Sequence, residues 1–365
     1  MIKNKILIGL AIMSTISFAA CAAGKPSERL IERLAKVSKA GNFAFGHHDD
    51  TAYGHTWEYM AGRSDVKEVC GDYPGLMNWD LGLIEWQCDK ELDGVPFNFI
   101  REEVKEQDER GGINAFSWHL RNPINKQDAW STTAGNVVKE CITTGTVAND
   151  TMKVWIARAA DFIKSLKDKK GNPIPVVFRP WHEHTGSWFW WGYDHCSADE
   201  YKALWRMTRQ IFDEKGVDNV VWAYSPDKDH VTDMASYLER YPGDAYVDIM
   251  GADVYHFDGE KGVPTYEERV KNVLSSATEA AEKHGKLVAF TETGSESLTM
   301  PNWWTEVLYK NIVKYPICYV CVWRNSNQNK KHFYAPYPGQ QSELSFKKFF
   351  KEKKTLFSKD MKKIK

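Results

Sequence analysis

IPVVFRPWHEHTGSWFWWG, residues 174–192, begins as an apolar run and ends in a cluster of ionisable and aromatic side chains. The run at 174–178 is apolar throughout, without alternation, which is typical of a strand covered on both faces of a parallel sheet. Arg179 follows at once, and Glu183 lies between His182 and His184. We therefore interpret this stretch as a buried strand whose carboxyl end carries chemically active groups.

Seven further stretches share this pattern and recur along the chain between turn residues. They are NFAFGHH at 42, GLMNWDLG at 75, INAFSWHL at 113, NVVWAYSP at 219, VDIMGADVY at 247, KLVAFTETG at 286 and YVCVWRN at 319. Helix-period segments at Ala157–Lys167, Tyr201–Glu214 and Tyr266–His284 separate some of them. Eight strands alternating with helices predict an α/β fold, a single-domain (β/α)8 TIM barrel. The doubly wound alternative lacks a nucleotide-binding glycine fingerprint.

Polar residues follow the strands at their carboxyl ends. In a parallel barrel these ends share one rim, which is where barrel active sites lie. The sequence therefore predicts that residues far apart in the chain converge there: His47, His48, Asp49, Asp80, His119, Glu183, Asp253, Tyr255, Glu292 and Arg324.

The first twenty-one residues are predicted to be a signal peptide rather than part of the fold, which leaves 22–365 as the catalytic barrel. Lys3 and Lys5 precede an apolar stretch that runs to Ala20. SFAAC at 17–21 resembles a bacterial lipobox, in which the cysteine becomes the lipidated N-terminus. We expect an exported, periplasmic protein that is attached to the outer membrane only through a lipid on Cys21. Simple cleavage of the signal is the alternative.

The composition narrows the class of protein and of ligand. In 365 residues, 48 basic and 49 acidic side chains leave a net charge of -1, so no overall field favours nucleic acid or an anionic membrane. Fifteen tryptophans indicate an aromatic groove for a neutral, partly apolar ligand. Six cysteines follow Cys21, and export permits disulfides, but the spacing fixes no pairing. We expect a monomer without a cofactor.

Glu183 and Glu292 end the fourth and seventh strand candidates, so both carboxyls can face the barrel mouth. Glycoside hydrolysis uses such a pair, one as a protonated acid and one as a carboxylate. The tryptophans at 181, 188, 190 and 191 are expected to surround Glu183 with apolar surface and to offer flat faces to sugar rings. The structural alternatives are an ion pair between Glu183 and Arg179, and a helix-capping role for Glu292.

A metal centre is the competing interpretation of His182-Glu183-His184 and of His47-His48-Asp49-Asp50. Adjacent residues of a strand point to opposite faces, so the first cluster cannot place all three side chains on one ion. It is also not the HExxH helix of a zinc peptidase. We predict no metal site.

Taken together, the motifs resemble glycoside hydrolase family 26, the retaining β-mannanases. GHHDDTAYG at 46, SWHL at 117, RPWHEHTGSWFWWG at 179, GADVYH at 251, TETG at 291 and VWRNS at 322 occur in family order and cover nearly the whole mature chain. The resemblance implies that Glu183 is the acid/base and Glu292 the nucleophile. It also implies that Tyr255 hydrogen-bonds the nucleophile, with the other substrate-binding positions at His119, His182, Trp188, Asp253, Trp323 and Arg324.

The resemblance further implies hydrolysis of β-1,4-mannosidic linkages in mannan, galactomannan or manno-oligosaccharides, with retention of configuration. Arg179 and His182 are the candidates for holding the acid in place. Other β-glucans, β-1,3-xylan and a non-catalytic carbohydrate-binding barrel are the alternatives. The segment from Asn125 to Asp150, rich in Thr and Asn, is expected to be a loop that influences whether cleavage is internal or at chain ends.

Overall fold

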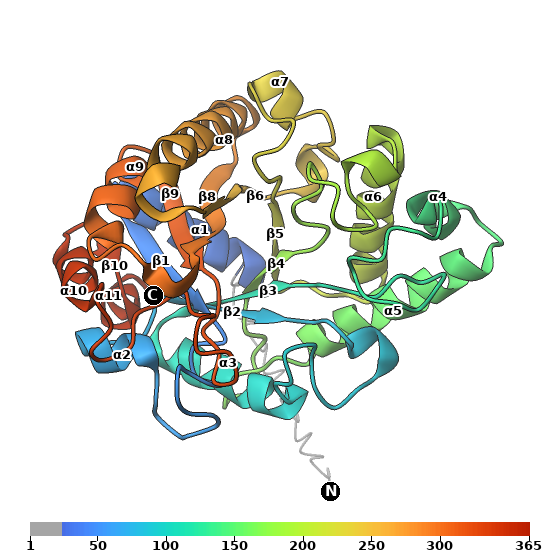
Figure 1. Cartoon of the computed structure of the whole chain (residues 1–365). Coiled ribbons are helices and arrows are strands. Elements are labelled where there is room, and N and C mark those ends of the chain that lie inside the picture. The colour runs from blue at the N-terminus through green and yellow to red at the C-terminus, as the bar shows by residue number, and fades with distance from the viewer. Residues whose placement is uncertain (1–23) are drawn as a thin grey trace, which may run out of the picture.

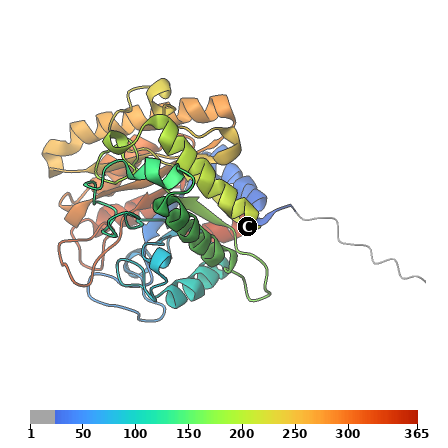
Figure 2. The same ribbon diagram turned by 90° about the vertical axis from the view of Figure 1, so that its right-hand side faces the viewer.

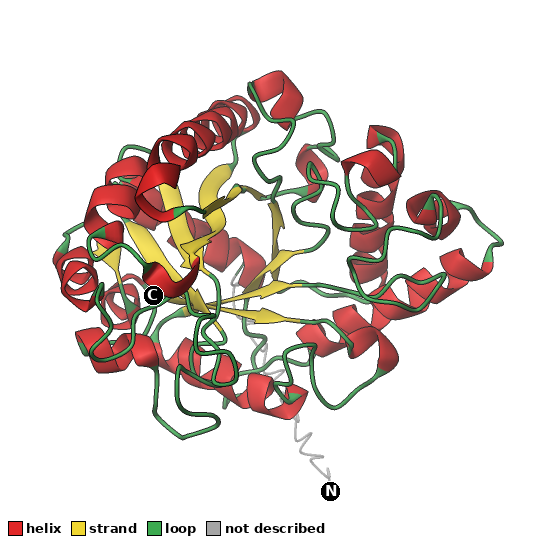
Figure 3. Cartoon of the chain, viewed as in Figure 1, coloured by secondary structure: helices red, strands yellow, loops and turns green. Residues whose placement is uncertain are grey.

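The computed structural model describes residues 24–365, so the predicted signal peptide and Cys21 lie outside the described residues. Ten strands form one parallel sheet inside a ring of helices (Figures 1 and 3). The strands are β1 (Phe43–His48), β2 (Leu76–Asp80), β3 (Ile113–Ser117), β4 (Val176–Arg179), β5 (Val220–Tyr224), β6 (Ile249–Met250), β7 (Asp253–His256), β8 (Leu287–Ser295), β9 (Ile317–Val322) and β10 (Thr355–Leu356).

The sheet closes on itself because β9 pairs with both β8 and β1. The sequence stretch at 247 supplies two short strands instead of one: β6 pairs with β5 and β8, and β7 continues along β8 with Asp253 opposite Glu292. Counting β6 and β7 as one barrel position, the eight predicted stretches occupy eight positions in chain order. The predicted (β/α)8 barrel is therefore confirmed.

Side-chain alternation along each strand decides what reaches the barrel interior. In β4, Val176 and Phe178 pack outward beneath the helices, whereas Val177 belongs to the interior cluster. Arg179, two residues after Val177, therefore points inward as well. The same two-residue alternation along β2 turns Asp80 to the barrel interior, on the mouth side of the interior residue Leu76. Apolar layers thus fill the lower barrel, and polar side chains form its upper layer.

The helices cover the outer face of the sheet. They are α1 (Pro26–Lys39), α2 (Asp65–Cys70), α3 (Phe97–Arg110), α4 (Val137–Ile142), α5 (Val147–Lys164), α6 (Ala198–Glu214), α7 (Met234–Tyr237), α8 (Val263–His284), α9 (Lys310–Ile312), α10 (Glu343–Lys351) and α11 (Ser358–Ile364). Short 3-10 turns occur at Ile84–Trp86, Tyr193–His195, Asp244–Tyr246, Gly259–Gly262 and Glu296–Leu298, and a π-helix spans Trp303–Tyr309.

The segment at 125–150 is not the open loop that its composition predicts, because it contains α4 and the start of α5. Its polar residues are helix caps: Asn136 accepts a hydrogen bond from Lys139 N–H, and Thr146 accepts one from Asn149 N–H. Thr and Asn are common in loops and at helix N-termini alike, so composition could not distinguish the two.

Helix α1 closes the base of the barrel, which is the end where the strands begin. Its buried residues Leu30, Leu34 and Val37 join the interior cluster, and the helix contacts β1, β5, β8 and β9. Figure 2 shows the start of the described chain and the C-terminus on the same side of the molecule. The mouth, at the opposite end, is left open.

Two further observations bear on the expectations from sequence. The six cysteines within residues 24–365 are all free thiols. In the same range, no helix combines the length and the apolar character needed to cross a bilayer.

Candidate active site

A cavity of about 410 Å³ opens at the carboxyl ends of the strands. It brings together seven of the residues singled out from the sequence: His119, Glu183, Trp188, Asp253, Tyr255, Glu292 and Trp323. These residues come from the ends of β3, β4, β7, β8 and β9 or the loops after them. The predicted convergence at one rim is therefore present, and both glutamates face one cavity.

Glu292 is held on β8 by two strong donors. Arg179, at the end of β4, donates from Nη2 to Glu292 Oε2. Tyr255, on β7, donates its hydroxyl to Glu292 Oε1 over 2.6 Å. Because a guanidinium and a phenol both donate to it, the Glu292 side chain is fixed in position.

Arg179 also bonds Asp253, with 2.6 Å between its Nη1 and Asp253 Oδ2. Burial lowers the pKa of the Arg179 guanidinium, but the charges of Asp253 and Glu292 outweigh this and leave it raised. Arg179 therefore supports Glu292, and neither the predicted support of Glu183 nor the alternative ion pair with Glu183 is present among its hydrogen bonds. Because the side chain at position 179 points into the barrel, its guanidinium reaches Asp253 on β7 and Glu292 on β8 instead.

Glu183 lies four residues beyond the end of β4, in a strained turn. Trp181 and Glu183 have φ values of 53° and 54°, a left-handed conformation that is uncommon outside glycine. The turn is held by hydrogen bonds: the Tyr201 hydroxyl donates to Trp181 O over 2.8 Å, and Glu183 N–H donates to Ser225 O over 2.7 Å. The strain directs the Glu183 carboxyl into the cavity.

Trp188 is the hydrogen-bond donor to the Glu183 carboxyl, with 2.7 Å between its indole Nε1 and Glu183 Oε2. Burial raises the pKa of Glu183 well above its usual range, and the nearby carboxylates of Glu292, Asp253 and Asp227 raise it further. The chain thus places a carboxyl with a raised pKa in the same cavity as a carboxyl held by a guanidinium. This division of roles is what acid/base chemistry at a glycosidic bond requires.

His119 lines the cavity and is held from behind by Asp80, whose Oδ2 lies 2.7 Å from His119 Nδ1. Burial opposes ionisation of Asp80, but the charge and hydrogen bond of His119 outweigh it and lower its pKa to about 2. His182 does not line the cavity. It is fully buried, with its Nε2 3.0 Å from His119 Nε2, so it supports His119 and contacts neither Glu183 nor the open space.

The aromatic walls of the cavity differ from those expected. Trp181, Trp190 and Trp191 are fully buried, and they pack on one another edge to face beneath the mouth. They cannot stack on a sugar ring. The aromatic side chains that line the cavity include Trp188 and Trp323 together with Trp130, Phe189, Tyr255, Phe257 and Tyr334.

Arg324 lies beside the cavity without lining it, and it forms an ion pair of 2.6 Å with Asp93. Nearby, His48, Asp49 and Asp93 could each bring one ligand atom within 4.8 Å of the others. Asp49 already accepts a hydrogen bond of 2.5 Å from the Tyr53 hydroxyl, and Asp93 is paired with Arg324. These partners favour a charged hydrogen-bond network here over a cation.

Sequence reasoning missed six residues of the cavity: Trp130, Phe189, Asp227, Lys228, Phe257 and Tyr334. Asp227 and Lys228 follow the fifth strand candidate directly, so the rule that polar residues end barrel strands could have found them. Trp130 and Tyr334 come from long loops, and the sequence gives no sign of where those loops fold.

Comparisons with known proteins agree with this geometry. A model of the family described as Glycosyl hydrolase family 26 matches residues 21–339. A mannan endo-1,4-beta-mannosidase of Bifidobacterium adolescentis is 31% identical over 90% of this chain and 34% of that protein. Another, from Bacillus subtilis, is 30% identical over 59% of this chain and 58% of that protein. The chain thus matches about a third and somewhat over half of these relatives' lengths.

Among solved structures, a GH26 beta-mannanase from Bacteroides ovatus superposes with a TM-score of 0.89 at 48% identity. The match covers 92% of this chain and 96% of that one.

Proposed function

This chain belongs to glycosyl hydrolase family 26, and on that premise we propose that it is a retaining glycoside hydrolase that cleaves β-1,4-mannosidic linkages. The observation that carries the proposal is the pair Glu183 and Glu292 in one cavity. One carboxyl has a pKa raised by burial, and the other is held by Arg179 and Tyr255.

In the first step, Glu292 attacks the anomeric carbon while Glu183 gives its proton to the departing glycosidic oxygen. The bond from the anomeric carbon to that oxygen breaks as the bond to the Glu292 carboxylate forms. Tyr255 and Arg179 orient Glu292 for the attack and limit its movement. A glycosyl ester on Glu292 results, and the leaving chain departs with the proton of Glu183.

In the second step, Glu183 takes a proton from water, and the resulting hydroxide displaces Glu292 from the anomeric carbon. Two inversions at one carbon restore the starting configuration. The charge of Glu292 raises the pKa of Glu183 in the free enzyme, so esterification of Glu292 removes that effect. Glu183 then loses its proton more readily and acts as the base. Retention predicts carboxyls about 5 to 5.5 Å apart.

The substrate proposed is a neutral β-mannan, galactomannan or manno-oligosaccharide. Trp188 and Trp323 present aromatic faces within the cavity, and such faces stack on the apolar sides of sugar rings. The two relatives described above are mannan endo-1,4-beta-mannosidases, which favours mannan over other β-glycans.

The proposal is tested by incubating the protein with a series of manno-oligosaccharides and with mannan, and by following products and their anomeric configuration by ¹H NMR. We expect β-configured products at the earliest times. The Glu292→Ala variant, purified in the same way, controls for contaminating enzymes. Cleavage of β-glucan or β-1,3-xylan in preference to mannan would mean that the substrate is that glycan and not mannan. Binding without hydrolysis would identify a carbohydrate-binding barrel, and α-configured products would exclude retention.

We also propose that the chain is exported to the periplasm as a monomer and is attached to the outer membrane by a lipid on Cys21. The lipobox-like SFAAC at 17–21 supports this proposal. Metabolic labelling with a radioactive fatty acid should label the protein, and the Cys21→Ser variant should not be labelled. Labelling of both would exclude this attachment site.

A further inference from the structure

The base of the barrel carries a dense cationic face formed by two segments far apart in the sequence. They are α1 with Lys25, and the C-terminal stretch 353–365. We define this basal cationic face by its ten exposed cations: Lys25, Arg29, Lys36, Lys39, Lys353, Lys354, Lys359, Lys362, Lys363 and Lys365. The same segments hold only three acidic residues, Glu28, Glu32 and Asp360, although the whole chain has a net charge of -1. Positive charge is therefore concentrated at this end.

The position of both segments follows from their contacts. Strand β10 pairs with the first residues of β1, and the Ser358 N–H donates to Tyr73 O just before β2. The Lys365 ammonium reaches Asp108 near the end of α3. The C-terminal stretch therefore passes beneath the starts of β1, β2 and β3, alongside α1. All ten cations lie at the end opposite the catalytic cavity.

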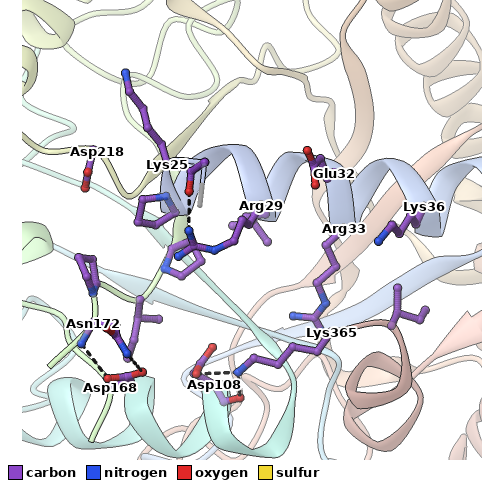
Figure 4. Close-up of a pocket in the computed structure, with 17 residues that line it drawn as sticks. Lys25, Arg29, Glu32, Arg33, Lys36, Asp108, Asp168, Asn172, Asp218 and Lys365 are labelled. Atoms are coloured by element: carbon purple, nitrogen blue, oxygen red, sulfur yellow. Dashed lines mark hydrogen bonds and ion pairs between the residues drawn. The ribbon is translucent and has the colours of Figure 1, made fainter. Parts of the chain in front are cut away.

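Most of these cations are not neutralised within the protein. Two form ion pairs, Lys363 with Asp360 over 2.9 Å and Lys365 with Asp108 over 2.7 Å. Within residues 24–365, the other eight have no ion-pair partner. A recess of about 790 Å³ lies beside α1. Figure 4 shows the residues that line it, including the ion pair of Lys365 with Asp108 and the hydrogen bond between Asn172 and Asp168. Asp108 is thus paired with a cation and Asp168 bonds a neutral amide, and Glu32 and Asp218 are the other acids that line the recess.

We propose that the basal cationic face docks on an anionic phospholipid surface and holds the catalytic mouth pointing away from it. Lysines near such a surface are attracted to its charged headgroups within about one Debye length, and several together give appreciable binding. The described chain also begins here, since Gly24 lines the same recess as Lys365. Cys21 lies three residues before Gly24 in the sequence. A lipid attached there would hold this face against the membrane. Docking of the basal cationic face is independent of the proposed hydrolysis.

The test uses the chain expressed from Ala22, without lipid, because α1 and the closed barrel lie wholly within residues 24–365. Sedimentation is measured with vesicles of phosphatidylglycerol and phosphatidylcholine, and with vesicles of phosphatidylcholine alone. We expect binding to the anionic vesicles at low salt, loss of binding at high salt, and none to phosphatidylcholine.

Two variants with equal charge change locate the binding. In the first, Lys353, Lys354, Lys362 and Lys363 become Glu, which should lower the bound fraction at least about tenfold. In the control, exposed lysines outside the face, Lys90, Lys139, Lys261 and Lys331, become Glu and should retain most of the binding. A set of Lys→Gln changes at the first four positions should also weaken binding, but by less, because it removes four positive charges without adding negative ones. Equal losses in basal and control variants, or no binding to anionic vesicles, would overturn the proposal.

Hydrogen exchange on the vesicle-bound protein tests the orientation independently. Amides of residues 25–39 and 353–365 should exchange more slowly when bound, while the loops at the mouth keep their free rates. Slower exchange at the mouth loops, or stronger binding to soluble polyphosphate than to vesicles, would contradict docking through the base on lipid.

Discussion

Glu183 and Glu292 are the same side chain at two strand ends of one barrel, and the protein treats them in opposite ways. Glu292 extends from within strand β8 and receives bonds from Arg179 and Tyr255. Glu183 comes from a strained turn beyond β4 and receives one bond from an indole. A guanidinium and a phenol hold Glu292 in position, whereas burial and nearby carboxylates raise the pKa of Glu183. The environment, and not the residue type, therefore assigns the roles.

The largest effect is expected from removing the anionic member. Glu292→Ala should lower kcat on manno-oligosaccharides by at least about 10⁴-fold, because no covalent ester can form. Calorimetric titration with mannohexaose should still detect binding. Ordinary turnover by this variant would mean that the two carboxyls are not divided as proposed.

Removing the protonated member should depend on the leaving group. Glu183→Ala should lower hydrolysis of manno-oligosaccharides by about 10²- to 10⁴-fold. An aryl mannobioside with a good leaving group needs no proton, so its first step should be nearly normal, visible as a burst of released phenol. If Glu183→Ala lost activity on both substrates equally, an acid role for Glu183 would be refuted. Glu292→Ala, inactive on both, is the matched comparison.

A smaller loss is expected when only the support of Glu292 is weakened. Tyr255→Phe removes the hydroxyl that donates to Glu292 Oε1 and keeps the ring. A hydrogen bond to a charged group contributes about 1.5–3 kcal/mol, so kcat should fall roughly ten- to a hundredfold. KM should change little, and the thermal midpoint should stay close to that of the parent. A wild-type kcat would show that Arg179 alone positions Glu292.

The smallest effect should be a shift in pH dependence. Asp227 is one of the carboxylates that raise the pKa of Glu183, so Asp227→Asn should lower that pKa. Because the first step needs protonated Glu183, activity is lost as pH rises through this pKa. The alkaline limb of kcat/KM should therefore move to lower pH, with a change in plateau rate of less than about tenfold. Movement to higher pH would show that Asp227 does not act through its charge.

Much of this architecture was predictable from local sequence. The eight apolar stretches, such as VVF at 176–178, are covered on both faces, and their lack of alternation predicts buried parallel strands. The order of the motifs identified the family correctly. The cap residues Asn136 and Thr146 led to the prediction of a loop, because the same side chains are common in loops and at helix N-termini.

The assignments that failed depended on direction and depth. Arg179 is only four residues from the acid Glu183 in sequence, yet its side chain bonds Glu292, 113 positions away. Trp190 and Trp191 follow the acid closely but are buried beneath the mouth. His182 supports His119 rather than Glu183. A turn with left-handed residues reverses side-chain directions over a few positions, which linear patterns do not reveal.

The sequence by itself determined the barrel, the order of its strands and which residue types end them, because hydrophobic periodicity and chain order are local properties. The tertiary structure alone decided which glutamate is held by Arg179 and which has a raised pKa, and which aromatic rings reach the cavity. It also gathered the cations of α1 and of the C-terminus at one end. These outcomes depend on closure of the barrel, which sets distances between residues that are remote in the chain.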